Sequence, residues 1–179
     1  MKYLLGGLVL AISACSISPG IGIEMTENNS EPRHRIVVKQ DNPTIHAIQY
    51  VGMTEQADRQ ELKEYTGVDP VRTEWCAAFV NAVLNETGIE GSASVSDYPL
   101  TARSFLQWGS KVTDPQPGDI VVFPRGNSSW QGHVGFYLKT LEINGVNYYL
   151  ILGGNQNNKV SIVPYRASKA LGIRRDTSL

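Results

Sequence analysis

A tight turn at residues 144–145, Asn-Gly, is the local feature that most constrains the fold. Asn-Gly between apolar residues is the strongest short-range signal of a two-residue β-hairpin. The flanking segments, residues 132–139 and 148–154, either alternate between apolar and other residues or are rich in residues that favour strands. The sequence therefore predicts an antiparallel pair of strands joined by this turn.

Two further segments extend the predicted sheet. Residues 120–123, Ile-Val-Val-Phe, follow a turn-rich break at residues 115–119, and residues 160–165 are also strand-like. The second half of the chain is therefore expected to form an antiparallel sheet.

The preceding part of the chain shows helical spacing. Thr54 is expected to cap a helix over residues 55–65, and a second helix is expected to begin near Thr73 and end before Gly88. A third helix is expected over residues 97–108, with a proline near its first turn and a glycine past its end. Helices followed by strands predict an α+β domain in which N-terminal helices pack on a central antiparallel β-sheet.

The first 14 residues resemble an export signal, with a basic start and an apolar run too short to span a bilayer. The run ends in Ile-Ser-Ala-Cys at residues 12–15, which resembles the lipobox of bacterial lipoproteins. That resemblance implies cleavage before Cys15 and its lipidation. A plain secretory signal with Cys15 near the cleavage point is the alternative. Ser16 after the cysteine suggests the outer membrane in a Gram-negative host, with the protein on the periplasmic side.

Residues 15–42 carry Ser, Pro, Gly, Asn and charges without a sustained period, which predicts a flexible tether. Residues 43–179 are then expected to form one domain of ordinary size. The 16 basic and 17 acidic side chains nearly balance, so nothing in the charge favours binding to nucleic acid. No Cys/His cluster or Asp-rich loop has metal-ligand spacing, so neither a metal nor another cofactor is expected.

If Cys15 is lipidated, Cys76 is a lone thiol in an oxidising compartment. Such a thiol is a liability unless it is buried or chemically used. With Thr73 as the cap, Cys76 lies in the first turn of a helix, where unpaired N–H groups and the helix dipole stabilise an anion. The sequence therefore predicts that Cys76 is a nucleophile.

A base for this thiol must come from the three histidines of the chain. His34 lies in the predicted tether and His46 in the first helical segment, and neither has a context that fixes it against the sheet. His133 begins a predicted strand, where it shares a face with Gly135 and Tyr137. We therefore predict that His133 is the general base.

The base needs a third side chain to orient its imidazole. Residues 153–158, Gly-Gly-Asn-Gln-Asn-Asn, supply amides at the end of the next strand. An unbroken two-residue hairpin places Gln156 opposite His133, whereas a single bulge places Asn155 there. An Asn-rich polar turn without a catalytic role is a further reading.

Three motifs occur in a characteristic order: Trp-Cys-Ala-Ala-Phe-Val at 75–80, Pro-Gly-Asp-Ile-Val at 117–121 and Gly-His-Val-Gly at 132–135. Over roughly residues 70–165 the chain resembles the NlpC/P60 and CHAP superfamily, papain-like bacterial and phage cysteine hydrolases that cut peptidoglycan. The resemblance implies a papain-like α+β fold with the catalytic cysteine at a helix N-terminus. The Asp of the second motif, Asp119, is interpreted as a turn former.

By that resemblance Cys76 is the nucleophile, His133 the general base and Asn155 the orienting residue. Trp75 and Trp130 are candidates to line a groove for glycan or stem peptide. Many CHAP proteins carry an acidic residue just before the asparagine, where this chain has glycine.

The leading interpretation is a monomeric, lipid-anchored peptidoglycan hydrolase that cleaves an amide bond by a Cys-His mechanism. The bond is either the one between muramic acid and the stem peptide or one within the peptide. An inactive envelope binding module of the same fold is the runner-up, and acyl or amide transfer is a third possibility.

Overall fold

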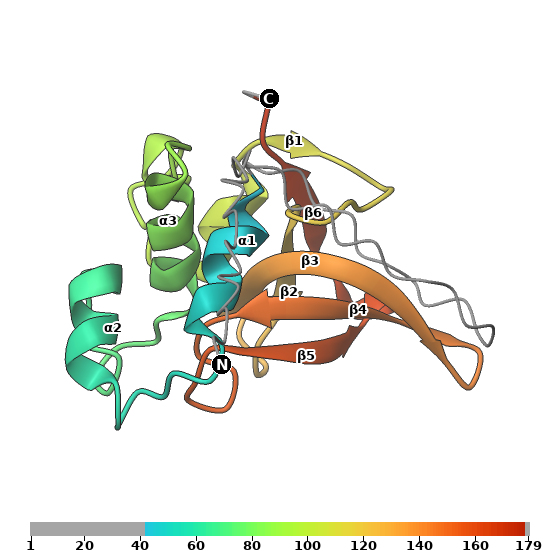
Figure 1. Ribbon diagram of the computed structural model, residues 1–179. Coiled ribbons are helices and arrows are strands. Elements are labelled where there is room, and N and C mark those ends of the chain that lie inside the picture. The colour runs from blue at the N-terminus through green and yellow to red at the C-terminus, as the bar shows by residue number, and fades with distance from the viewer. Residues whose placement is uncertain (1–41, 178–179) are drawn as a thin grey trace, which may run out of the picture. The chain divides into compact units, whose positions relative to one another are not determined.

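The computed structural model describes residues 42–177, and these residues form an α+β unit, as the sequence predicts (Figure 1). The helical elements are α1 (Pro43–Ala47), η1 (Ile48–Tyr50), α2 (Arg59–Thr66), α3 (Cys76–Glu86), η2 (Ser92–Ser94), η3 (Ala102–Leu106) and η4 (Ala167–Lys169). The strands are β1 (Ser110–Lys111), β2 (Ile120–Pro124), β3 (Gly132–Ile143), β4 (Val146–Gly153), β5 (Ser161–Arg166) and β6 (Gly172–Arg175).

The predicted signal segment, Cys15 and the predicted tether up to residue 41 lie outside the described residues. Asn42, the last residue of that tether, caps α1, because its side-chain oxygen accepts a hydrogen bond from the Thr44 N–H at 2.9 Å. Within residues 42–177, no helix is both long and apolar enough to cross a bilayer.

One six-stranded sheet has the order β1-β6-β2-β3-β4-β5, and the pairs between its strands are antiparallel. The predicted hairpin joins β3 to β4, with Asn144 and Gly145 at φ values of 51° and 74°, as a type I′ turn requires. A bulge between Tyr137 and Lys139 shifts the β3–β4 register by one residue.

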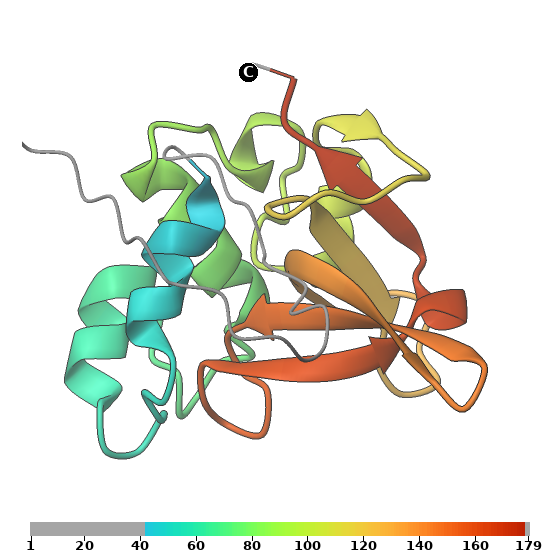
Figure 2. The ribbon, with the colours of Figure 1, turned by 45° about the vertical axis from the view of Figure 1, so that its right-hand side comes forward.

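The three α-helices of the described chain lie on one side of the strands (Figures 1 and 2). Val134, Phe136 and Leu138 of β3 face them and join the main core with Phe79 and Val80 of α3. Thus β3 alternates as predicted. The opposite face of the sheet carries a smaller apolar cluster: Val121, Phe123, Tyr137, Ile151 and Ile173.

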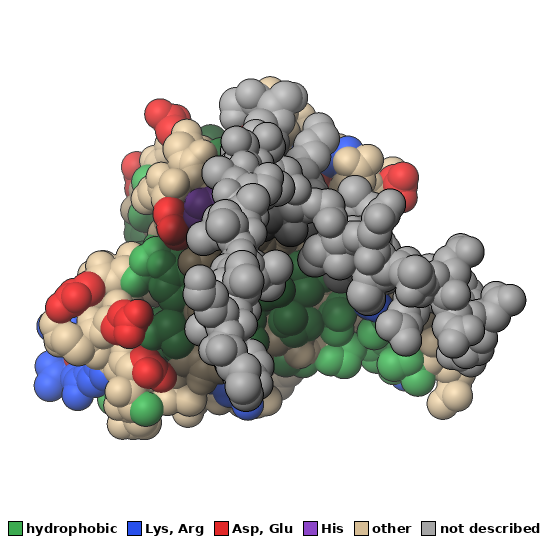
Figure 3. Space-filling model, viewed as in Figure 1, with side chains coloured by type: hydrophobic (Ala, Val, Ile, Leu, Met, Phe, Trp, Pro, Cys, Tyr) green, Lys and Arg blue, Asp and Glu red, His purple; other side chains and the backbone are tan. Residues whose placement is uncertain are grey.

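Both of the first two helices predicted from the sequence begin later than expected. Near α2 the Asp58 carboxylate accepts the Thr54 N–H at 2.7 Å, so residues 55–58 form turns and the helix begins at Arg59. Charged side chains of both signs lie over α2 (Figure 3). Further along, α3 begins at Cys76 rather than near Thr73, so the thiol belongs to the first residue of its helix.

The third predicted helix is wrong in extent, because only Ala102–Leu106 is helical and it forms a 3₁₀ segment. The preceding chain is held by tertiary contacts. The Pro99 carbonyl accepts hydrogen bonds from the Asn81 side chain at 2.9 Å and from the Ser92 hydroxyl at 3.1 Å. These contacts hold the residues before η3 in a loop of turns and bends against α3.

Asp119, in the turn before β2, is structural as the sequence indicates. It is buried and accepts two hydrogen bonds at 2.8 Å from the Arg175 guanidinium. Its other role is to accept the Gln116 N–H at 2.7 Å, which closes the turn. The pair fixes the end of β6 beside the start of β2.

Gly154 makes room for the helix that carries Cys76. A Cβ at this position would lie 2.6 Å from a ring carbon of Trp75 and 2.7 Å from the Cβ of Phe79, both fully buried. We expect Gly154→Ala to lower the free energy of unfolding by about 1–3 kcal/mol, as measured by denaturant titration, because the core has no space for the methyl group.

Gly153→Ala is the matched comparison for this prediction. The closest atom to its added Cβ is the Val134 carbonyl oxygen at 3.3 Å, so we expect Gly153→Ala to lower the free energy of unfolding by less than Gly154→Ala does. Equal stability of Gly154→Ala and the wild type would contradict the close packing of Gly154 on Trp75.

Candidate active site

Cys76 presents its thiol at the N-terminus of α3. Its predecessor Trp75 is the N-cap residue and makes no side-chain capping bond, so first-turn N–H groups are left for other acceptors. Hydrogen bonds from the backbone N–H groups of Val134 and Ala77 lower the pKa of the sulfur, as does the positive charge of Arg125. Burial outweighs them and raises the pKa of the Cys76 thiol above its ordinary value, so the resting group is the neutral thiol.

The imidazole of His133 and the thiol of Cys76 share Tyr165 of β5 as a neighbour, and Val134, the residue after His133 in β3, donates its N–H to the sulfur. The ring is 2% exposed and stacks on Tyr165 of β5 with centroids 5.2 Å apart. Burial raises the pKa of Tyr165, and Cys76 raises it further when its sulfur is ionised, which is consistent with the three side chains forming one cluster.

Gln156 holds the far side of the imidazole, with its Oε1 atom 3.1 Å from Nε2 of His133. The Gln156 amide nitrogen faces three backbone carbonyls, those of Ser161 at 2.5 Å, Gly153 at 3.3 Å and Ile151 at 3.4 Å. Since this NH₂ group can only donate, Oε1 must be the atom that faces the ring. Neutral His133 therefore carries its proton on Nε2.

That tautomer leaves the Nδ1 lone pair of His133 free. Nδ1 is buried and has no hydrogen-bond partner among residues 42–177. Burial, and then the charge of Arg125, lower the pKa of His133 to about 4, while the bond to Gln156 opposes them. At neutral pH the ring is thus an uncharged acceptor that can take a proton from the thiol.

The structure does not bring Asn155 to the imidazole, which corrects the expectation for the third residue. The Asn155 side chain donates to the Glu74 carboxylate at 2.6 Å, and its backbone carbonyl accepts from Arg125 at 3.1 Å. Asn155 has a left-handed φ of 55°, which directs its side chain away from the ring and lets Gln156 take that place.

Residues 68–155 match the family model for the CHAP domain. The protein carries a CHAP domain. It is thereby a member of the CHAP and NlpC/P60 superfamily, as its motifs indicate. CHAP domains are typically hydrolases that cleave peptidoglycan, so peptidoglycan is the substrate that the family implies. A search of curated proteins found no matching relative.

The CHAP match ends at Asn155, one residue before the amide that contacts His133. The sequence offers Gln156 as one of two candidates and predicts no role for Glu74, Arg125 or Tyr165. The sequence position of Tyr165 could have suggested it as a neighbour of His133, since it lies at the end of a predicted strand in the same sheet. The sequence position of Arg125 suggests no such role, because it lies in a loop without periodicity.

Of the two tryptophans expected to line a groove in this CHAP domain, Trp75 is a core residue instead. It is fully buried, packs edge-on against Phe79 and donates its indole N–H to Glu55 at 3.3 Å. It therefore positions α3 rather than contacting a ligand. Trp130, in the loop between β2 and β3 that leads to His133, is 66% exposed and its role in substrate binding stays a prediction.

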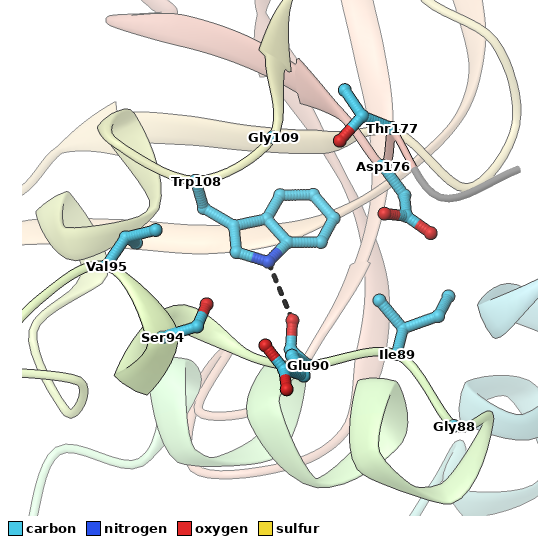
Figure 4. A pocket seen from close by; sticks show the side chains of 9 residues that line it. All are labelled: Gly88, Ile89, Glu90, Ser94, Val95, Trp108, Gly109, Asp176 and Thr177. Atoms are coloured by element: carbon cyan, nitrogen blue, oxygen red, sulfur yellow. Dashed lines mark hydrogen bonds between the residues drawn. The ribbon is translucent and has the colours of Figure 1, made fainter.

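A separate cavity of about 340 Å³ lies beyond the C-terminal end of α3 (Figure 4). Trp108 forms one wall and donates its indole N–H to the Glu90 carbonyl at 2.8 Å. An 11-residue helix places this end roughly 15 Å from Cys76. None of the described residues that line the cavity is Cys or His, so it is distinct from the thiol site of the CHAP domain.

Proposed function

We propose that the protein is a peptidoglycan hydrolase that cleaves an amide bond with Cys76 as nucleophile and His133 as general base. As the sulfur attacks the carbonyl carbon, Nδ1 of His133 accepts the thiol proton. The imidazolium then donates this proton to the leaving amine as the C–N bond breaks, which leaves a thioester. Water, deprotonated by His133, attacks the thioester and releases a carboxylic acid, and the proton returns to the thiol.

The observation that carries this proposal is the buried Nδ1 of His133, which has no hydrogen-bond partner among residues 42–177 and belongs to a ring that shares Tyr165 as a neighbour with Cys76. A buried ring nitrogen without a partner lowers stability, and a catalytic role is one explanation for its presence in a folded protein. The Gln156 amide supports the same reading, because it fixes the tautomer in which Nδ1 is the acceptor. First-turn N–H groups of α3 are candidates to stabilise the oxyanion of each intermediate.

The test is digestion of purified sacculi by the full chain, with the soluble products identified by mass spectrometry. We expect fragments to be released, and we expect treatment with iodoacetamide before mixing to abolish their release. Stem peptides that begin at L-alanine would assign cleavage to the bond with muramic acid, whereas shorter peptides would assign it within the stem. No release above that of boiled protein would contradict the proposal.

Export and lipid attachment through Cys15 complete the proposed function and would place the domain at peptidoglycan on the periplasmic side. The motif at residues 12–15 supports this proposal. We expect Cys15→Ala to abolish metabolic labelling of the protein by a palmitate analogue, with Cys76→Ala as the control that keeps the label. Persistent labelling of Cys15→Ala would rule out attachment at this cysteine.

A further inference from the structure

Arg125 joins three loops that border the thiol site. From the loop after β2, its guanidinium forms an ion pair with Glu74, two residues before Cys76. A second guanidinium nitrogen donates to the backbone carbonyl of Asn155 at 3.1 Å, in the loop after β4. Asn155 closes the triangle by donating its side-chain amide to the same Glu74 oxygen at 2.6 Å.

The charge of Arg125 acts on both reacting side chains. It lowers the pKa of Cys76, which favours the thiolate, and it lowers the pKa of His133, which favours the neutral ring. The charge of Arg125 therefore favours the thiolate of Cys76 and the neutral ring of His133. These are the forms in which the sulfur can attack and the imidazole can act as a base.

We propose that Arg125 is a positioning residue of the thiol site, which fixes the loops around Cys76 and His133 and supplies the positive charge that promotes attack by the sulfur. The inference rests on the proposed function only in taking Cys76 as the nucleophile. Asn155 then contributes to the site because its backbone carbonyl accepts a hydrogen bond from Arg125, and not through a contact with the imidazole.

The other charged or titratable groups around the sulfur are few. Glu74, in the segment before α3, raises the pKa of the thiol. His133 of β3 and Tyr165 of β5 complete the surroundings, and Tyr165 has a raised pKa because of burial, so it is neutral at pH 7. Arg125 and Glu74 are thus the two fixed charges that act on the thiol, with opposite signs.

These opposite signs give a test that needs no peptidoglycan. The rate at which iodoacetamide alkylates Cys76 in the full chain is measured against pH and quantified on the peptide that contains Cys76. We expect Arg125→Gln to shift the profile upward by about one pH unit, which is about tenfold slower alkylation below the thiol pKa. Arg125→Lys should keep most of the wild-type profile, and Glu74→Gln should shift it downward.

Arg72→Gln is the matched control, because it removes a cation that is 80% exposed and pairs with Asp69 instead. Its alkylation profile should coincide with that of the wild type. Wild-type profiles for Arg125→Gln and Glu74→Gln, or shifts of both in the same direction, would overturn the inference. If the shifts occur but sacculi are not digested, the inference stands and the proposed hydrolase fails.

Discussion

Cys76→Ala is expected to reduce the release of fragments from sacculi by about 10⁴-fold or more, because no other side chain can form the thioester. Residues 42–177 contain no other cysteine, so a second thiol of the domain cannot replace it. The measurement is the initial rate of soluble muropeptide release at equal protein concentration.

His133→Ala should lower the same rate by about 10²–10⁴-fold, since the thiol is neutral at rest and needs a base to accept its proton. Thermal unfolding of each variant provides the control for folding. If the wild type and Cys76→Ala release nothing but both co-sediment with sacculi, the protein is a binding module of the CHAP fold. Equal release by the two would exclude Cys76 as the nucleophile.

Much of the fold could be predicted because its signals are local. The Asn144-Gly145 turn and the alternation of β3 depend on residues close together in sequence, and both predictions are confirmed. The strand β1 could not be predicted, because its two residues pair with Arg174 and Arg175 more than 60 positions away. A two-residue strand has no period of its own, so only its distant partner defines it.

The limits of helix prediction have a similar physical cause. Thr54 does begin a turn, but the Asp58 carboxylate holds its N–H and delays α2 until Arg59. Pro99 and Gly109 fit the two ends of a helix, yet tertiary hydrogen bonds from Asn81 and Ser92 to the Pro99 carbonyl hold the residues before η3 in another conformation. The spacing of apolar residues does not show which polar side chains will form hydrogen bonds with the backbone and so prevent a helix from forming.

The third residue of the site shows why register reasoning fails at the end of a strand. The bulge at Tyr137 does occur, and simple continuation of the shifted register would place Asn155 opposite His133. However, β4 ends at Gly153, and the loop places its asparagines at left-handed φ values. Gln156 is thereby turned into the protein, where it reaches the imidazole.

The sequence prediction for Trp75 is wrong for a related reason. An aromatic residue next to a nucleophile fits a ligand groove as well as a core, and the sequence before it does not distinguish the two. The deciding residue is Gly154, almost 80 positions later, whose missing side chain leaves space for the indole. Arg125 and Glu74 form a contact across 51 positions, which likewise has no local signature.

Gln156→Leu is expected to lower turnover by about 10²–10⁴-fold while leaving Cys76 in place. Leucine cannot accept a hydrogen bond from the Nε2–H group of His133, so the tautomer with the proton on Nδ1 is no longer disfavoured. That tautomer has no lone pair facing the thiol. The measurement is kcat for muropeptide release, with KM expected to change little because Gln156 is buried beneath the ring.

Asn155→Gly is the matched comparison, since glycine tolerates the left-handed φ of this position and keeps the carbonyl that receives Arg125. We expect it to lose less than about tenfold in turnover, because its side chain contacts Glu74 rather than His133. A larger loss in Asn155→Gly than in Gln156→Leu would return the orienting role to Asn155.

Gln156→Glu tests the contact through the pH profile, because it adds a negative charge beside Nε2 of His133. It also removes the N–H groups that face the backbone carbonyls of Ser161 and Gly153, so thermal unfolding is measured alongside. Wild-type activity requires neutral His133 and should rise as the pH rises through about 4, where burial and Arg125 hold the pKa of the ring. A carboxylate beside Nε2 favours the imidazolium and raises that pKa, so the acid limb of kcat/KM should move to higher pH. An acid limb that stays at the wild-type pH in a folded Gln156→Glu protein would show that this side chain does not govern the base. With the limb shifted in a variant that is folded at the assay temperature, the contact between Gln156 and His133 would account for the protonation state of the general base.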